Sequence, residues 1–313
     1  MSDISLTASM RSNLLSLQNT QSLMDTTQER LSTGKKVNSA IDNPSSYYTA
    51  QSLNNRASDL SSLLDSMGQA IQTIKAADEG IEAITSFAQQ AKAVAQSALD
   101  SSDATERENY MKQFNDILGQ IDGIAKDSGY KGVNLLNGGN LTVKFNEDGT
   151  SDLKIAGKTA TADGLGINAG ADWAKDLATK KTAVDTAQAE YDKAAEGDKA
   201  DKKTALETAQ KAYDTAMTAA TAAIETSVTE VDKAVSTLRS MASEFGNNYS
   251  IVQSREDFTE NLINVLTEGA DKLTLADMNE ESANMLALQT RQQLAINSLS
   301  LASQAAQSVL KLF

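Results

Sequence analysis

The stretch "LALQTRQQLAINSLSLASQAAQSVLKLF" (Leu286–Phe313) ends the chain with a helix-forming pattern that carries only two charged side chains. Chain ends usually fray unless a partner holds them. On a helix of 3.6 residues per turn, apolar residues at alternating steps of three and four share one face, as in a coiled-coil seam. That face, interrupted by Gln292, comprises Met285, Leu288, Ala295, Leu299, Ala302, Ala306, Val309 and Phe313.

The same helix carries a second apolar stripe, about a third of a turn away from the first at roughly 100° per residue. It consists of Leu294, Leu301, Ala305 and Leu312. One partner helix covers one narrow stripe, so the pattern predicts a second partner for the same segment.

The beginning of the chain repeats this two-faced design. One face is formed by Leu6, Met10, Leu14, Leu17, Met24 and Leu31, and a second face by Ile4, Ala8 and Leu15. The segment "TGKK" (residues 33–36) supplies the glycine and the basic side chains that commonly close a helix. We therefore predict that the N-terminal and C-terminal helices pair with each other.

The middle of the chain reads as further long helices. One runs from Ser45 to about Leu99, with Gly68 and Gly80 as its weak points. The segment "DSSDAT" (residues 100–105) ends it and caps a second helix that extends to about Asp127. Together these two segments predict an antiparallel helical hairpin.

Between residues 129 and 170 the sequence becomes rich in glycine and in β-branched residues. The segment "LTVKFNEDGTSDLKIA" (residues 141–156) alternates apolar and polar residues around Asp148-Gly149, which is typical of a β-hairpin. Heptads return after Trp173, break at residues 196–198 and resume from about Lys199 to Glu268. In this last segment the residues at seven-residue steps are Gln210, Met217, Ile224, Val231, Leu238 and Phe245. The predicted fold is mainly α: a long antiparallel bundle with paired terminal helices, a small β-hairpin and an outer helical hairpin.

Composition excludes most catalytic chemistry. The chain lacks Cys and His, which removes thiol nucleophiles, imidazole bases and thiolate zinc sites. Neighbouring carboxylates such as Glu106 and Glu108 have no basic cluster to tune them, which favours solvated helix faces. The segment "NEDGTSD" (residues 146–152) lacks the remaining ligands of a calcium loop. We predict no catalytic residues, no cofactor and no metal.

The net charge of −14 is unevenly distributed. Residues 1–60 carry five acids and five bases, and residues 281–313 carry one acid and two bases, so the acidity lies in the middle. Such a chain offers no basic patch for nucleic acid. Residues 292–310 are uncharged, but nine of these nineteen are Gln, Asn or Ser, which argues against a membrane span.

Two separated segments resemble a known family. The segment "ERLSTGKKVNSAIDNP" (residues 29–44) is similar to the N-terminal signature of bacterial flagellins, and "ADMNEESANMLALQTRQQLAINSLSLASQAAQSVLKLF" (residues 276–313) is similar to their C-terminal signature. The ending Leu312-Phe313 and the run Asn279-Glu280-Glu281-Ser282 are most similar to the alphaproteobacterial type.

The resemblance implies a subunit of the flagellar filament, secreted through the flagellar type III apparatus and extracellular. Its implied partners are further copies of itself, the filament cap, hook-filament junction proteins and an export chaperone. Residues 1–44 with 269–313 would form the inner coiled coil, residues 45–168 with 222–268 the helical bundle and hairpin, and residues 169–221 a short variable outer hairpin. A hook-filament junction protein or another type III-secreted coiled-coil protein remains the alternative.

The residues expected to form the assembly interface belong to the two terminal helices. They are Leu6, Met10, Leu14, Leu17, Met24, Leu31, Met285, Leu288, Leu294, Leu299, Leu301, Val309 and Phe313.

Overall fold

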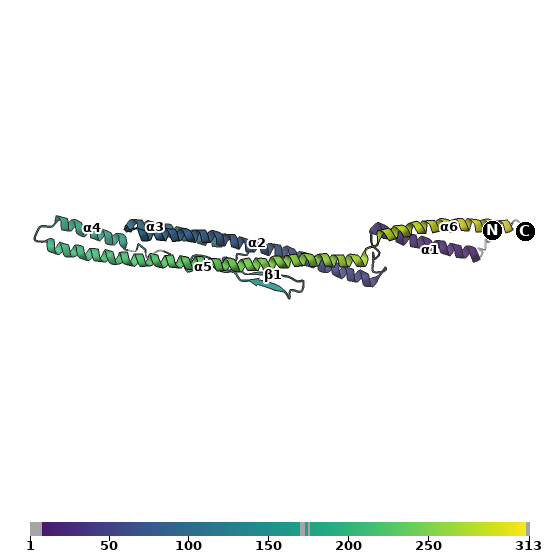
Figure 1. The fold of residues 1–313 in the computed structure, drawn as a ribbon, viewed down its shortest axis with the longest axis horizontal. Coiled ribbons are helices and arrows are strands. Elements are labelled where there is room, and N and C mark those ends of the chain that lie inside the picture. Colours follow the sequence, from purple (N-terminus) through teal and green to yellow (C-terminus); the bar gives the residue numbers. More distant parts are fainter. Residues whose placement is uncertain (1–7, 170–172, 175, 311–313) are drawn as a thin grey trace. The chain divides into compact units, whose positions relative to one another are not determined.

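The computed structural model describes residues 8–169, 173–174 and 176–310, and it is mainly helical, as predicted (Figure 1). The elements are α1 (Ala8–Thr33), α2 (Pro44–Asp100), α3 (Ala104–Asp127), β1 (Leu141–Lys144), β2 (Asp152–Ile155), α4 (Leu177–Lys193), α5 (Lys199–Thr274) and α6 (Met278–Leu310). They form two compact units, one of Met1–Ser61 with Glu260–Phe313 and one of Ser62–Thr259. In the part of the chain that the structure describes, no helix is long and apolar enough to cross a membrane.

The core of the Ser62–Thr259 unit lies where α2, α3 and α5 pack together. Along α5, Ile224, Val231, Leu238, Phe245 and Val252 recur every seven residues, and all are fully buried. Because this period matches two helical turns, the row stays on the side of α5 that faces its neighbours. Most of the predicted heptad is confirmed, but Gln210 at its beginning is exposed.

On α2 the buried row changes character along the helix. Met67, Ile74 and Ile81 are followed at the same spacing by Ala88 and Ala95, all almost completely buried. Small side chains allow helix axes to approach more closely. The bundle therefore packs on large side chains at one end of this row and on alanine at the other.

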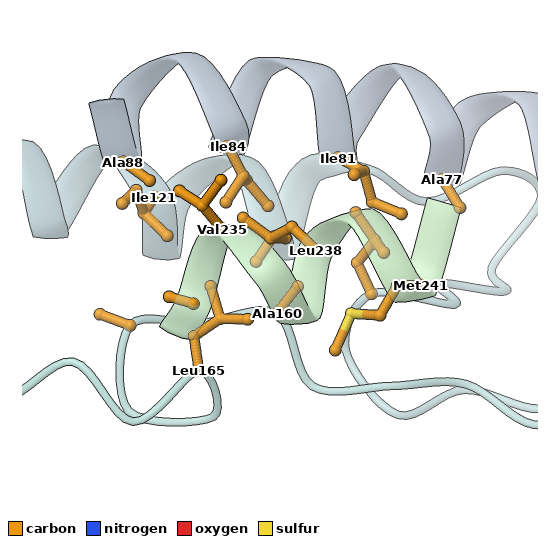
Figure 2. Packing of buried hydrophobic residues seen from close by; sticks show 14 of the residues in the cluster. Ala77, Ile81, Ile84, Ala88, Ile121, Ala160, Leu165, Val235, Leu238 and Met241 are labelled. Atoms are coloured by element: carbon orange, nitrogen blue, oxygen red, sulfur yellow. The ribbon is translucent and has the colours of Figure 1, made fainter. Parts of the chain in front are cut away.

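Figure 2 shows how the chain after β2 closes this core. Ile84 of α2, Ile121 of α3 and Leu238 of α5 point toward one another, and Ala160 and Leu165 of the chain after β2 belong to the same cluster. Both of these last residues are buried, although they lie outside any regular element. The loop is thus part of the core packing of the bundle.

The predicted break between α2 and α3 is confirmed, together with its cap. Asp103 Oδ1 accepts hydrogen bonds from Thr105 N at 2.8 Å and Glu106 N at 3.1 Å. These are two of the backbone donors that have no partner within the first turn of a helix. The Asp103 side chain therefore fixes the point at which α3 begins.

The β-hairpin is confirmed at the predicted position. β1 and β2 pair antiparallel, with Leu141 opposite Ile155 and Lys144 opposite Asp152. Gly149 in the turn has a φ of 67°, a conformation that glycine adopts without steric cost. The segment that superficially resembles a calcium loop is therefore a hairpin turn.

Gly80 lies inside the continuous helix α2, and its neighbours explain why a glycine stands there. A Cβ at this position would overlap Ser128 Oγ and would come within 2.6 Å of Leu136 Cδ1. A side chain at this position would have to displace Ser128 and Leu136, because the chain following α3 passes directly against α2 at this level. The sequence pattern of α2 alone could not reveal that neighbour.

α5 ends at Thr274, beyond the predicted end near Glu268. The main-chain nitrogen of Lys36 donates to Thr274 O at 2.7 Å, and Lys36 Nζ donates to Lys272 O at 3.2 Å. The last carbonyl groups of α5 are therefore satisfied by the chain that follows α1. Lys36, one of the basic residues that the sequence placed at the end of the first helix, therefore caps α5.

Candidate functional site

α1 and α6 lie side by side, and side-chain hydrogen bonds define how they pair (Figure 1). Asn13 Nδ2 donates to Ser298 Oγ at 3.4 Å, and Gln292 Nε2 donates to Gln21 Oε1 at 2.8 Å. Arg30 Nη1 forms an ion pair with Glu281 Oε1 at 3.0 Å. The number of the α6 partner falls as the α1 number rises, so the two helices are antiparallel.

The contact between them is a narrow seam. Met10 is 7% exposed, and Leu17, Met24 and Leu31 follow at seven-residue steps as partly buried side chains. On α6, Met285, Leu288 and Leu299 are partly buried, as are Ala295 and Ala302. This is the spacing by which apolar side chains hold a two-stranded coiled coil together.

Polar side chains occupy the remaining seam positions. Thr20 and Thr27 are 3% and 6% exposed, and Thr20 Oγ1 donates to Ser16 O at 2.8 Å. Glu281 is 7% exposed and forms an ion pair with Arg30. The hydroxyl of Thr20 is satisfied within α1, whereas the Arg30–Glu281 pair joins the two helices and favours one register. The two helices are therefore aligned by polar contacts as well as by apolar burial.

Local capping explains where α6 begins. Asp277 Oδ1 accepts hydrogen bonds from Asn279 N at 2.9 Å and from Glu280 N at 3.3 Å. Glu280 and Glu281 lie in the first turn, where negative charge interacts favourably with the helix dipole. The position of these two carboxylates is therefore explained by their stabilisation of the beginning of α6.

The loop that leaves α1 is similarly fixed by a carboxylate. Asp42 Oδ2 accepts hydrogen bonds from Ser39 N at 2.9 Å and from Asn38 N at 3.0 Å. These donors favour the charged form, so they hold the pKa of Asp42 below its ordinary value. The loop therefore leaves the end of α1 in one defined conformation.

Several large apolar side chains of α1 and α6 lie outside the seam and are exposed. This outer face, as we name it, consists of Leu14, Leu15 and Leu23 on α1 and Leu286, Leu294, Ile296 and Leu301 on α6. Their exposures range from 37% for Leu14 to 67% for Leu301. Exposed apolar side chains gathered on two paired helices are typical of interaction surfaces.

The expected interface residues fall into two groups. The structure places Met10, Leu17, Met24, Leu31, Met285, Leu288 and Leu299 in the seam, and it places Leu14, Leu294 and Leu301 on the outer face. Leu6, Phe313 and the side chain of Val309 lie outside the described residues.

Sequence reasoning omitted several members of both groups. Leu23, Leu286 and Ile296 belong to the outer face, and Thr20 and Thr27 belong to the seam. The seven-residue spacing of Asn13, Thr20 and Thr27 is visible in the sequence, but a search restricted to apolar residues passes over it.

No alternative centre for chemistry stands out in the described residues. They contain no group of three or more Asp and Glu side chains placed to hold a metal ion. Glu106 accepts a hydrogen bond from Ser101 Oγ at 2.7 Å beside the cap of α3. The exposed apolar residues of α1 and α6 are therefore the site considered below.

Comparisons with known proteins point to one family for both ends of the chain. Residues 4–141 match the bacterial flagellin N-terminal helical region, and residues 228–313 match the bacterial flagellin C-terminal helical region. These matches together include α1, α2, α3 and α6, the first residue of β1 and the later part of α5.

Individual relatives are similar over almost the full length. Flagellin FljM of Caulobacter vibrioides is 27% identical over 306 residues, covering 96% of this chain and 95% of its own. Flagellin C of Rhizobium meliloti is 27% identical, with coverages of 93% and 92%, and a flagellin of Brucella melitensis is 26% identical, with coverages of 100% and 99%. The similarity therefore spans the whole architecture.

Proposed function

The chain belongs to the bacterial flagellin family, and from that membership we propose that it enters the flagellar filament through the outer face of α1 and α6. Members of this family are structural proteins, not enzymes. The chain is accordingly a subunit that polymerises with copies of itself into the extracellular filament of the bacterial flagellum.

The observation that carries the proposal is the contrast between seam and outer face. The seam already satisfies one side of each terminal helix, yet Leu294 and Leu301 remain 64% and 67% exposed. Full burial of a leucine side chain contributes about 1.5 to 3 kcal/mol. A neighbouring subunit that covers this face removes several such side chains from water and so favours assembly.

The two groups of expected interface residues then have different tasks. Seam residues such as Met24 and Leu288 hold the two helices of one subunit in register. Outer-face residues such as Leu14 and Leu301 contact the next subunit. Leu6, Val309 and Phe313 extend the apolar pattern of the helices toward both ends of the chain.

Charge supports the assignment of an inner and an outer part. Residues 1–44 with 269–313 are nearly neutral and suit burial at the centre of a filament, while the acidic middle suits solvent. Residues 45–168 with 222–268 form the next layer in this proposal, and residues 169–221 the outer hairpin. The compact units divide within α2 and α5 instead, so the proposed layers are divisions by role in the filament.

Further partners follow from the same assignment. A secreted subunit whose terminal helices expose apolar side chains requires protection before assembly, which is the role we propose for an export chaperone. The filament cap and the hook-filament junction proteins are proposed to meet the same outer face at the two ends of the polymer.

The test compares two variants of α6. The double change Leu294→Gln and Leu301→Gln should leave the monomer folded, because both side chains are exposed in it, but should abolish seeded polymerisation. The matched control is Ser300→Gln, an exposed neighbour off the apolar row, which should polymerise like the unsubstituted chain. Normal filaments from the double variant, seen by electron microscopy, would contradict the proposal.

A further inference from the structure

The segment "NLLNGGN" (residues 134–140) contains the one asparagine of the chain that a glycine follows, Asn137 before Gly138. Asparagine is among the thermally labile residues of proteins. Its amide carbon can react with the main-chain nitrogen of the next residue, and a glycine in that position adds no side chain that hinders the approach. Whether the pair reacts in the folded protein depends on how the fold holds that amide and that nitrogen.

The fold occupies the two neighbouring asparagine side chains. Asn134 Nδ2 donates to two main-chain carbonyl groups at the end of α3, each at 2.9 Å, and its Oδ1 accepts from Leu136 N at 2.8 Å. Asn140 Oδ1 accepts from Gly157 N at 3.1 Å. Both asparagines are also followed directly by a leucine. Hydrogen bonds and a bulky neighbour therefore keep these two amide groups from reacting.

The side chain of Asn137 is held by no such contact. The residue is exposed, and no hydrogen bond joins its side chain to any residue that the structure describes. Gly138 is exposed too, with a φ of 78°, and glycine changes its conformation at little steric cost. Its nitrogen donates to Lys158 O at 3.2 Å, at the long end of the usual range. This one long hydrogen bond has to open before the nitrogen can reach the Asn137 amide.

We propose that Asn137 is a site of spontaneous deamidation in the folded protein. Gly138 N forms a bond to Asn137 Cγ, the bond from Cγ to Nδ2 breaks, and the proton of the attacking nitrogen leaves with the amide group as ammonia. The succinimide ring that remains is then opened by water at either of its carbonyl groups. One product is aspartate, and the other is isoaspartate, in which the main chain runs through the former side chain.

The surroundings leave no room for a longer main chain. A Cβ on Gly139 would come within 2.6 Å of Asn134 O, and a Cβ on Gly157 would overlap Gly139 O. The same two segments are joined by a hydrogen bond from Lys158 N to Leu135 O at 2.7 Å. Isoaspartate adds a methylene to the main chain inside this contact. Its formation should therefore loosen the pairing of residues 134–139 with residues 157–160.

This pairing matters because it closes the core of the bundle. Leu135 and Leu136 are completely buried, and Ala160 N donates to Leu136 O at 2.9 Å. The side chain of Ala160 is buried in the same cluster. A slow chemical change at an exposed position thus reaches buried residues through the main chain.

Two exposed Asp-Gly pairs, Asp148-Gly149 and Asp163-Gly164, can form the same kind of ring only by losing water. An aspartate is ionised at neutral pH, and its negative charge makes the carboxylate carbon a poorer target for a nucleophile than an amide carbon. We therefore expect Asn137 to react before either pair. Rearrangement of an aspartate also leaves the mass unchanged, so a mass measurement reports on asparagine.

Peptide mapping of the purified full-length chain tests the proposal. The protein is incubated in mildly alkaline buffer, which favours the reactive deprotonated nitrogen, and is then digested with trypsin. Cleavage after Lys131 and Lys144 releases one peptide that contains Asn134, Asn137 and Asn140. Conversion of an amide to an acid raises the mass of this peptide, and its fragmentation assigns the change to one residue. The mass should rise with time at Asn137 alone, above the background of a sample digested without incubation.

The matched control is Asn137→Gln. Glutamine keeps an exposed amide but places it one methylene farther from Gly138 N, which disfavours ring closure, so the mass increase should be lost. No conversion at Asn137 in the unsubstituted chain would overturn the inference. Equal conversion at Asn134 or Asn140 would also overturn it, because the hydrogen bonds of the fold would then not select the site.

Amide hydrogen exchange measures the consequence for the loop. Protein that contains isoaspartate, separated by chromatography, should exchange the amide protons of Lys158 and Ala160 faster than the unmodified chain. Asn137→Asp carries the new charge without the added methylene and should exchange like the unmodified chain. Faster exchange in Asn137→Asp, or unchanged exchange in the isoaspartate form, would contradict the proposed effect of main-chain length. These measurements use the monomer, so their outcome is independent of whether the chain polymerises.

Discussion

Two helical glycines, Gly80 and Gly119, differ in what surrounds them and so provide a matched test of the packing. A Cβ at Gly80 meets Ser128 and Leu136, while a Cβ at Gly119 meets nothing within 4 Å. We expect Gly80→Ala to destabilise the protein by roughly 1 to 3 kcal/mol through overpacking. Gly119→Ala should stabilise it by about 0.5 to 1 kcal/mol through helix propensity. Chemical denaturation checks both values, and a stabilised Gly80→Ala variant would show that the close approach is wrong.

Asp103 joins the cap of α3 to α4 and gives the contact a defined dependence on pH. Its carboxylate accepts from Lys181 Nζ at 2.8 Å as well as from Glu106 N and Thr105 N, and these contacts lower its pKa from 3.8 to about 2. A group whose pKa is lower in the folded state stabilises that state above its unfolded pKa. The contribution is therefore complete above about pH 4 and is lost as the pH falls toward 2.

The measurement is the NMR titration of the Asp103 carboxyl group, whose midpoint should lie near 2. Asp103→Asn keeps an oxygen that caps the helix but removes the charge. In that variant, protection of the α4 amide groups should no longer change between pH 4 and pH 2. A midpoint near 3.8 in the unsubstituted chain would mean that the Lys181 contact does not persist in solution.

At the residue scale, the sequence predicted which side of each terminal helix is apolar. It did not predict how narrow the buried part of that side is. Met10, Leu17 and Met24 lie in the seam, but Leu14 on the same expected face is 37% exposed. A single partner helix covers a narrower stripe than the apolar pattern suggests. Thr20 and Thr27 are buried because they occupy heptad positions, which a pattern of apolar residues alone cannot indicate.

At the element scale, α4 and the first part of α5 form a hairpin built from related sequences. "KKTAVDTAQAEYDKA" (residues 180–194) and "KKTALETAQKAYDTA" (residues 202–216) agree at ten of fifteen positions. The agreement places Val184 and Leu206, both partly buried, at equivalent positions. We therefore interpret the hairpin as a duplicated segment. Equivalent parts of its two helices can be removed without changing the contacts that remain between α4 and α5.

A deletion of residues 184–208, closed by a short glycine-rich linker, tests whether this hairpin is needed for assembly. It retains Leu177 and Lys181, and it retains Thr221 Oγ1, to which the buried Arg107 donates at 2.9 Å. We expect a folded monomer that polymerises like the full chain, because the proposed contacts lie elsewhere. Unchanged fluorescence of the buried Trp173 would verify folding, and a folded variant that forms no filaments would assign a structural role to the hairpin.

Most boundaries of the elements could be predicted because they depend on local chemistry. The Asp103 cap, the Gly149 turn and the break near Gly197 are visible as short motifs. The end of α5 was not predictable, because Lys36, more than two hundred residues earlier in the chain, supplies its cap. Long-range contacts of this kind leave no local signal.

For the whole molecule, the distinctive property is that the pairing of the two terminal helices buries only part of their apolar side chains. α1 and α6 bury a seam against each other, while the outer face leaves Leu15, Leu23, Leu286 and Leu301 more than half exposed. In contrast, the α5 row around Leu238 is fully buried within its own unit. We therefore predict that assembly stabilises the terminal helices far more than the bundle.

Amide hydrogen exchange in monomer and filament measures this difference most directly. Amide groups of α1 and α6 should exchange at least about a hundred-fold more slowly in the filament, the factor for roughly 2.7 kcal/mol of added local stability. Amide groups of α5 around Leu238 should be strongly protected in both states and serve as the internal reference. Equal exchange of α1 and α6 in monomer and filament would contradict the claim that their outer face is the assembly surface.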